Sequence, residues 1–290
     1  MDSIFLLRAY GDFVIALTSV KNSQRINSLE LVISNHLAPL FHALPQEKLP
    51  PGLQLRFHDF GIKKSLMRCF TNKHLLHTDT CKELWALRKY IKTRDKENTG
   101  FNNLFLENRK RAYLPAMITG HRFNHIIKEE NVYDSYTRFF QSYITEIPGD
   151  FNSKAPGLRV LLLPDARMKN KTIDLALIEK IRHSFTQSGS TLTTAFFEKA
   201  PSGDKSQCVV YRNFKELIGY INQADFIIGA DSLPVHLCQF LEKPHCMLYP
   251  GRIKRYRQKQ FFTPFVLRTG YYYSFEELAQ RSSFFPNSST

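Results

Sequence analysis

The second half of the chain alternates short apolar runs with amphipathic segments at a short, regular period. No other feature constrains the fold as strongly, because most apolar runs between residues 158 and 251 are followed by a helical pattern. Such alternation is typical of a parallel sheet with helices on both faces. We therefore predict an α/β fold, with strands at 158–164, 191–198, 206–212, 225–231 and 244–250 and helices at 173–185, 213–224 and 233–242.

The first half begins with the same alternation. A helical pattern follows Asp12. Residues 63–96 are rich in Lys, Arg and His and are predicted to be helical in part. Residues 133–147 have the spacing of an amphipathic helix. Strands are predicted at the apolar runs 4–9, 29–35 and 53–61.

The segment PGDFNSKAPG, residues 148–157, is the best candidate for a linker, because it holds two prolines, two glycines and several polar residues. A chain of 290 residues is long enough for two domains, since a domain averages about 100–200 residues. We therefore expect domains at 1–150 and 151–290, both Rossmann-like and facing each other across a cleft. Whether the last helix of the second domain packs back on the first is left open.

Composition narrows the class of protein. The hydrophobic content of 43% supports a large core, and no apolar run reaches the roughly 18–20 residues of a membrane span. The segment MDSIFLLRAYGD begins with an acid and lacks the basic start of a signal peptide, so we expect a soluble cytoplasmic protein. The five cysteines form no CxxC pair, which argues against a disulfide framework and a zinc site.

The chain is strongly basic, with 40 Lys and Arg residues against 26 Asp and Glu residues and a formal net charge of +14. Such a surface attracts nucleic acid, phosphorylated metabolites or an anionic membrane face. Its basic clusters contain aromatic residues, which also fits a nucleic-acid surface. No RRM, KH, helix-turn-helix or zinc pattern accompanies them, so we expect no nucleic-acid partner.

The segment DSLPVH, Asp231–His236, follows an apolar run and precedes a helical pattern. Pro234 suits the first turn of that helix, where its missing N–H costs nothing. The free N–H groups and the positive dipole end of a helix start form an anion pocket, in which Ser232 bonds a phosphate oxygen. Equally, Ser232 is a plain N-cap and His236 packs in the core, and the local sequence leaves both interpretations open. The chain has neither GxGxxG nor GxxxxGK(S/T), so a nucleotide would need another motif.

Three segments in order resemble the ADP-heptose type glycosyltransferases of family 9. They are LLRAYGDFVIALTSV near the start, LLLPDARMKNKTI after the linker, and ADFIIGADSLPVHLCQFLEKPHCMLYPG at 224–251. The resemblance covers the first strand–helix unit and most of 158–251, whereas 60–150 carry no recognisable motif. It implies the GT-B fold, with the donor on the second domain and the acceptor mostly on the first. It also implies inverting transfer from a nucleoside-diphosphate sugar, with no metal and no cofactor.

In the second domain, the resemblance implies Lys171 as the main partner of the donor diphosphate, with Arg167 and Lys169 as assisting charges or as a plain solvated loop. Asp231 is implied to bond sugar hydroxyls of the donor. Glu198, just after a predicted strand, is a candidate for the ribose. The donor site is thus expected at Arg167, Lys169, Lys171, Glu198, Asp231, Ser232, Leu233, Pro234, Val235 and His236.

In the first domain, the resemblance implies Asp12 as the base that takes the acceptor proton, and an ordinary helix cap is the alternative. Arg8 and Gly11 are expected to contact an anionic acceptor. The implied acceptor is a lipopolysaccharide precursor or another lipid-linked surface glycan. Peripheral association with the anionic inner membrane face is therefore expected, aided by the basic clusters.

Two positions depart from the family pattern. Leu233 stands where the family has a glycine that lets a pyrophosphate approach the backbone closely. Asp165 stands where the family has a glycine after the strand proline, which places an acid beside the expected diphosphate. Two hypotheses therefore remain: a divergent glycosyltransferase with another donor, or a catalytically inactive GT-B-like protein that binds a glycan or nucleotide.

Overall fold

The computed structural model describes residues 1–6, 9–58, 78–96, 103–106, 116–126, 132–144, 157–187, 189–200, 207–249 and 271–274. The chain divides into two compact units, Met1–Ile144 and Thr145–Thr290. Each unit contains one sheet, and all strand pairings between described residues are parallel. The predicted α/β class is therefore confirmed. Most of the predicted linker lies outside the described residues.

The first unit holds a five-stranded sheet with the order β3-β2-β1-β4-β5. Its strands are β1 Asp2–Leu6, β2 Leu29–Ser34, β3 Gln54–His58, β4 Leu104–Leu106 and β5 Phe123–His125. Its helices are α1 Tyr10–Val20, α2 Ala38–Ala43, α4 Thr78–Lys96 and α6 Val132–Phe140, with 3-10 turns at Ile26–Ser28, Asn35–Leu37 and Gln46–Lys48. β2 is buried along its whole length, as expected for a parallel strand covered on both faces.

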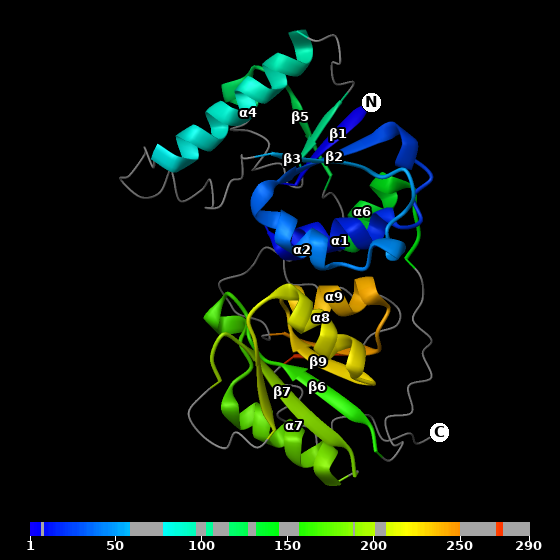
Figure 1. Ribbon diagram of the computed structural model, residues 1–290, viewed down its shortest axis with the longest axis vertical. Helices are drawn as coiled ribbons and strands as arrows, with labels where there is room; N and C mark the ends of the chain where they lie inside the picture. The colour runs from blue at the N-terminus through cyan, green and yellow to red at the C-terminus, as the bar shows by residue number, and fades with distance from the viewer. Residues whose placement is uncertain are drawn as a thin grey trace. The chain divides into compact units, whose positions relative to one another are not determined.

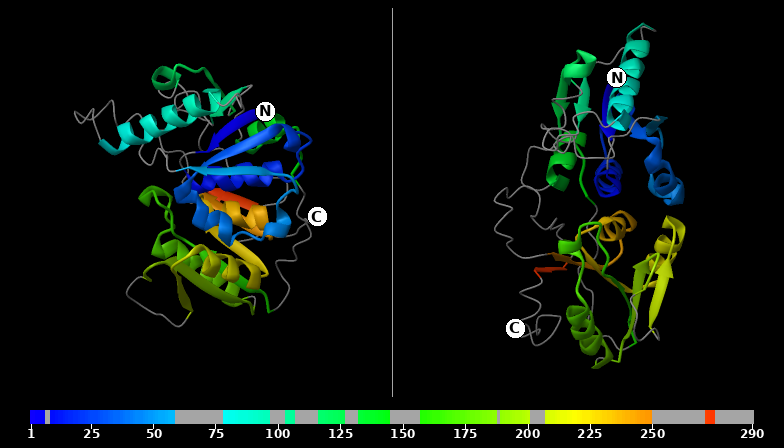
Figure 2. Two further views of the ribbon diagram at one scale, coloured as in Figure 1. Left: turned by 45° about the horizontal axis from the view of Figure 1, so that its top comes forward. Right: turned by 90° about the vertical axis from the view of Figure 1, so that its left-hand side faces the viewer.

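Helices cover both faces of this first sheet (Figures 1 and 2). On one face, Leu87 and Ile91 of α4 join Phe5 of β1 and Val32 of β2 in one buried cluster. On the other face lie α1 and α6, which contact each other. Ile4, the neighbour of Phe5 in β1, is also buried, because successive side chains of a strand point to opposite faces.

Two helices of the first unit differ from the sequence-based expectation. α1 begins at Tyr10 rather than after Asp12, so Gly11 and Asp12 lie in its first turn. α6 ends at Phe140 rather than near residue 147. There Gln141 adopts the left-handed conformation, with a φ of 49°, which is a common way for a helix to end.

A buried charge cluster lies at the amino-terminal edge of the first sheet. Glu30, the second residue of β2, is completely buried and accepts from Arg94 Nη1 at 2.9 and 2.8 Å. Arg56 of β3 also pairs with Glu30, and the Ser3 hydroxyl donates to it at 3.1 Å. These contacts join α4 to three adjacent strands. They lie at the end of the sheet opposite to the carboxyl ends, where ligands bind in open α/β sheets.

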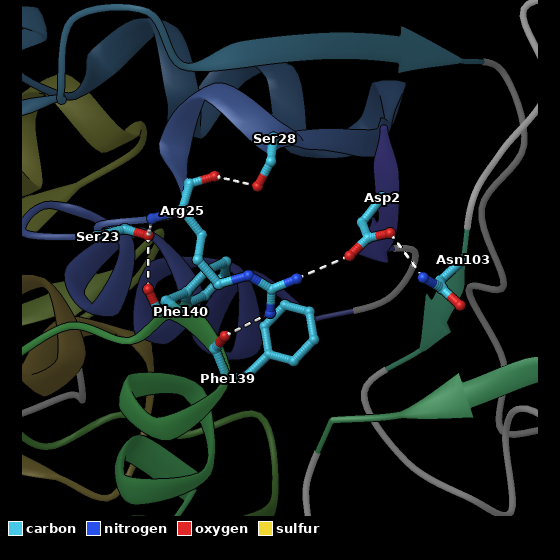
Figure 3. A network of polar contacts seen from close by, with 7 residues as sticks. All are labelled: Asp2, Ser23, Arg25, Ser28, Asn103, Phe139 and Phe140. Atoms are coloured by element: carbon cyan, nitrogen blue, oxygen red, sulfur yellow. Dashed lines mark hydrogen bonds and ion pairs between the residues drawn. The ribbon is translucent and has the colours of Figure 1, made fainter.

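Arg25 connects further elements at the same edge (Figure 3). Its Nη2 lies 2.7 Å from Asp2 Oδ2, and its Nη1 donates to the Phe139 carbonyl at 2.9 Å. The guanidinium carbon lies 5.0 Å from the centre of the Phe139 ring, a cation–π contact. Asn103 donates to the second oxygen of Asp2 at 2.9 Å. Arg25 therefore joins β1 to α6 and has a structural role.

The second unit holds a six-stranded sheet with the order β11-β10-β9-β6-β7-β8. Its strands are β6 Arg159–Leu163, β7 Thr191–Phe197, β8 Cys208–Tyr211, β9 Phe226–Ala230, β10 His245–Tyr249 and β11 Tyr271–Ser274. Its helices are α7 Leu175–Gln187, α8 Phe214–Gln223 and α9 Leu233–Leu241, with a 3-10 turn at Lys169–Lys171. The strands and helices predicted for 158–251 are thus all present, with bounds that differ by a few residues.

Helices also cover both faces of the second sheet (Figures 1 and 2). α7 packs on one face, where Ile181 and Phe185 join Leu162 and Ile228 in a buried cluster. α8 and α9 lie on the other face and contact each other. α7 begins two residues later than predicted because the Asp174 carboxylate accepts from the backbone N–H of Leu177 at 2.8 Å, as an N-cap does.

Candidate functional site

Two loops at the carboxyl-terminal edge of the second sheet bring Lys171 and Asp231 together. Lys171 lies in the loop after β6, Asp231 directly follows β9, and these two strands are neighbours in the sheet. The Lys171 Nζ atom lies 2.6 Å from Asp231 Oδ2. The side chains are only 16% and 10% exposed, so this ion pair is far better shielded from water than a surface pair.

The loop after β6 is closed by its own hydrogen bonds. The Ile173 N–H donates to the Pro164 carbonyl at 3.0 Å, and the Thr172 hydroxyl donates to the Ala166 carbonyl at 3.3 Å. The Lys171 N–H closes the 3-10 turn on the Met168 carbonyl at 2.8 Å. This geometry directs Lys171 toward Asp231, whereas Arg167 and Lys169 of the same loop are exposed.

The start of α9 is seated by a glycine in the preceding strand. A Cβ atom on Gly229 would lie 2.5 Å from Val235 Cγ2, so only glycine allows α9 to approach β9 this closely. Leu233 and Pro234 form the first turn of α9, as predicted for Pro234. His236 is the fourth residue of α9 and is only 6% exposed.

Ser232 has the extended backbone of an N-cap, with φ of −155° and ψ of 178°. Its hydroxyl does not cap α9 but donates to the backbone carbonyl of Asp165 at 3.0 Å. The Asp231 N–H donates to the Leu248 carbonyl of β10 at 2.9 Å. The segment Asp231–Ser232 is therefore held between the ends of β6 and β10. Ser232 occupies the N-cap position and His236 is buried, as the N-cap interpretation expected, but the Ser232 hydroxyl bonds Asp165 instead of a helix N–H.

The Asp165 carboxylate is directed at β7. Its Oδ2 accepts from the backbone N–H of Phe197, the last residue of β7, at 2.8 Å. Burial raises the pKa of the Asp165 carboxyl above its usual value, and the hydrogen bond from Phe197 opposes that shift. Glu198 follows Phe197 with a left-handed φ of 61° and is exposed. Sequence reasoning placed Asp165 just past a predicted strand end but assigned it no ligand contact. It missed Phe197, although a large aromatic residue at a strand end was a visible signal.

The acceptor-side residues belong to the first unit. Asp12 is the third residue of α1, where the positive end of the helix dipole favours a carboxylate. Gly11 precedes it in the same turn, and Arg8 lies outside the described residues. The alternative of Asp12 as the N-cap is wrong, because Ala9 occupies that position.

The structure therefore gathers part of the predicted donor site. It brings Lys171, Asp231 and Ser232 together and adds Asp165 to them through the Ser232 hydroxyl. Among the described residues, no three His, Cys, Asp or Glu side chains are grouped as metal ligands. In the same part of the chain, no helix has both the length and the apolar character to cross a membrane.

Two Rossmann-like units with parallel sheets define the GT-B class of fold. No family model and no curated protein sequence matches this chain. Solved structures do match: 97% of the chain is similar to 96% of an E. coli heptosyltransferase solved with ADP, with a TM-score of 0.58 and 13% identity. The fold is thus that of the family 9 glycosyltransferases, as the resemblance implied.

Two further solved structures have the same fold. One is an ADP-heptose LPS heptosyltransferase II from E. coli, with a TM-score of 0.56, 10% identity, and coverage of 97% of this chain and 94% of that one. The other is a family 9 glycosyl transferase from Veillonella parvula DSM 2008, with a TM-score of 0.53, 12% identity, and coverage of 94% and 85%. Sequence identities this low establish the fold and leave the activity to be argued from the site.

Proposed function

We propose that this protein is an inverting, metal-independent glycosyltransferase. It moves a sugar from a nucleoside-diphosphate sugar, of the ADP-heptose kind, to a hydroxyl of a lipopolysaccharide or other surface-glycan precursor. The observation that carries the proposal is the shielded Lys171–Asp231 pair beside the start of α9. A cation, a sugar-binding acid and a helix start at one sheet edge form a diphosphate-sugar site.

In this proposal, Lys171 stabilises the negative charge that grows on the leaving diphosphate. A lysine ammonium has three N–H donors, so it can keep its contact with Asp231 while another N–H bonds a phosphate oxygen. The first turn of α9 supplies the positive end of the helix dipole. This turn consists of Leu233–Val235, and His236 follows it. Arg167 and Lys169 add exposed positive charge on the same loop.

Asp231 accepts hydrogen bonds from sugar hydroxyls, and Glu198 accepts one from the ribose. Asp12 is the base. The acceptor oxygen forms a bond to the anomeric carbon as the bond from that carbon to the diphosphate oxygen breaks, and the acceptor proton passes to Asp12. Attack opposite to the leaving group inverts the anomeric centre. The chain needs no cofactor for this step.

The acceptor is an anionic, lipid-linked glycan that Arg8 and Gly11 contact, and the protein works at the cytoplasmic face of the membrane. Helix α4 supports this peripheral association, because one stripe of it carries exposed side chains three or four residues apart. The Trp85 ring in that stripe is 64% exposed and lies 5.2 Å from the Arg88 guanidinium carbon. Basic residues beside an exposed Trp favour an anionic membrane surface. The stripe consists of Lys82, Trp85, Lys89, Lys92 and Lys96.

The first experiment is a thermal-shift screen of the full chain against ADP-, GDP-, UDP- and CMP-sugars. A ligand that binds only the folded state raises the melting temperature, so at least one donor should do so. The donor found is then incubated with lipid-linked acceptors, and product is followed by mass spectrometry. Binding without turnover of any acceptor would favour the inactive binding protein instead. Absence of binding by every nucleotide would refute the proposal.

A further inference from the structure

Phe197 is an aromatic side chain that packing does not explain. It is the last residue of β7, yet it is 49% exposed. Among the large apolar side chains that the described residues leave exposed, it is the one that lies in a strand. Since ligands of open α/β sheets bind beyond the carboxyl ends of strands, a ring exposed at this edge lies where a ligand would contact it.

A neighbouring ring supports Phe197. Tyr211, the last residue of β8, is 6% exposed, and its ring centre lies 5.6 Å from that of Phe197 at an angle of 47°. Phe197 is therefore held by a buried ring and still exposes half of its surface. A rigid ring of this kind suits stacking on a flat base, because little side-chain freedom is lost on binding.

Asp165 connects this ring to the start of α9. Its backbone carbonyl accepts from the Ser232 hydroxyl at 3.0 Å, and its carboxylate accepts from the Phe197 N–H at 2.8 Å. A carboxylate has about four acceptor positions, so one N–H leaves others for a ligand. The N–H contact fixes the carboxylate at the end of β7, between Ser232 and the exposed ring.

The charge of Asp165 limits what can lie against it. A diphosphate is repelled by a carboxylate, whereas a hydroxyl donates to it. β9, β6 and β7 are consecutive in the sheet, and neighbouring strands are about 4.8 Å apart. The path from Ser232 past Asp165 to Phe197 thus spans about 10 Å, which accommodates a nucleoside attached to a diphosphate at α9.

We propose that Asp165 and Phe197, the nucleoside ledge, bind the nucleoside of the donor. The Asp165 carboxylate accepts a hydrogen bond from a ribose hydroxyl, beside the ribose contact of Glu198, and the exposed face of Phe197 stacks on the base. The acid that departs from the family pattern is therefore a specificity-determining residue that selects ribonucleotides. This inference rests on the proposed function, because it assumes a nucleoside diphosphate at Lys171 and α9.

The test measures affinity by calorimetry with four probes: ADP, 2′-deoxy-ADP, 3′-deoxy-ADP and inorganic pyrophosphate. The full chain is compared with Asp165→Asn, which keeps an oxygen for the Phe197 N–H, and with Phe197→Ala. We expect Phe197→Ala to weaken the binding of ADP about tenfold or more. We expect wild type to bind one of the two deoxy-ADP compounds about tenfold more weakly than ADP. In Asp165→Asn, most of this difference in affinity between ADP and the deoxy compound should disappear. Neither variant should weaken the binding of pyrophosphate.

The binding of pyrophosphate distinguishes a role in nucleoside binding from a structural role. If either variant weakens pyrophosphate as much as ADP, the residue supports the fold and the proposal is overturned. The proposal is also overturned if wild type and both variants bind a nucleoside diphosphate (ADP, GDP, UDP or CDP) with the same affinity. The variant Lys171→Met should weaken both ADP and pyrophosphate. If wild type binds no nucleotide and no pyrophosphate, the proposed function itself fails, which is a distinct result.

Discussion

Lys171 Nζ lies 2.6 Å from Asp231 Oδ2, although the two residues are 60 positions apart in the chain. The contact exists because β6 and β9 are hydrogen-bonded neighbours, so the loops that follow them meet at one edge of the sheet. Two groups that a diphosphate sugar would contact are thereby held together in a largely buried position.

Replacing Lys171 with Met should weaken binding of a nucleoside diphosphate about 10- to 100-fold, because a hydrogen bond to a charged group is worth about 1.5–3 kcal/mol. Calorimetry with ADP measures the effect. Lys169→Met is the matched control, since Lys169 lies on the same loop but is exposed, and we expect a loss of less than about fivefold. Equal losses in the two variants would mean that general loop charge, and not Lys171, binds the diphosphate.

Replacing Asp12 with Asn should reduce the rate of transfer at saturating substrate by about 100-fold or more, because a general base contributes about 10²–10⁴-fold. Donor affinity should stay unchanged, since Asp12 belongs to the first unit and the proposed donor residues to the second. The control is Asp134→Asn, an exposed acid in the first turn of α6. Transfer at the wild-type rate in Asp12→Asn would rule out Asp12 as the base.

Burial raises the pKa of Asp165, so the folded state holds its proton to higher pH than the unfolded state, where the ordinary value is 3.8. The stability that this group contributes is present below the unfolded-state pKa and lost as pH rises through the folded-state pKa. The melting temperature of Asp165→Asn, relative to wild type, should therefore increase as the pH rises from below 3.8 through the raised folded-state pKa.

The opposite trend is expected for Asp225→Asn. Hydrogen bonds from Arg159 lower the pKa of Asp225, so its contribution is present above the unfolded-state pKa and lost as pH falls. The variant should therefore lose melting temperature, relative to wild type, as pH rises. Thermal melts across the pH series measure both variants. Parallel pH profiles for Asp165→Asn and Asp225→Asn would contradict the assigned environments.

Replacing Arg94 with Ala should lower the free energy of unfolding by about 3 kcal/mol, because it leaves the buried Glu30 carboxylate without its best-shielded cation. Arg56→Ala is the comparison, since the Arg56 side chain is 52% exposed and its pairing should contribute less than about 1 kcal/mol. Urea denaturation measures both changes. Equal losses would show that the burial of the pair does not decide its contribution.

Reversing two charges on α4, Lys89→Glu with Lys92→Glu, should reduce binding to vesicles that contain anionic lipid by at least about 30-fold. Each basic residue contributes about 1 kcal/mol near such a surface, and the new acids are repelled by it. Sedimentation with phosphatidylcholine vesicles, with and without phosphatidylglycerol, measures the effect. The control, Lys21→Glu with Lys215→Glu, changes the net charge equally outside α4. If both pairs reduce binding equally, the net charge and not α4 governs it.

Local sequence was sufficient for the elements of the second unit as far as β10, whereas β11 was not predicted. The apolar run that became β9 is bounded by polar residues, and Pro234 marks the first turn of α9, so both could be read without knowledge of their neighbours. The positions of Lys171 and Asp231 after strands were predictable in the same way. Their direct contact was not, because it requires β6 to lie beside β9.

The partners of polar groups were the part that sequence reasoning missed. Ser232 reads as a helix cap, but its hydroxyl reaches the carbonyl of Asp165. Glu30 reads as a charge within an apolar run, but Arg94 from a distant helix neutralises it in the core. A hydrogen bond depends on atoms a few ångströms apart, and no local pattern records which segments the fold brings that close.

The sequence by itself determined the α/β class, the order of strands and helices in 158–251 and the polar residues at the strand ends, because periodicity and turn residues act over a few positions. Only the tertiary structure decided that Lys171 pairs with Asp231 and that the Asp165 carboxylate turns toward Phe197. Those contacts follow from the order of strands in the sheet, which depends on the burial of the whole core.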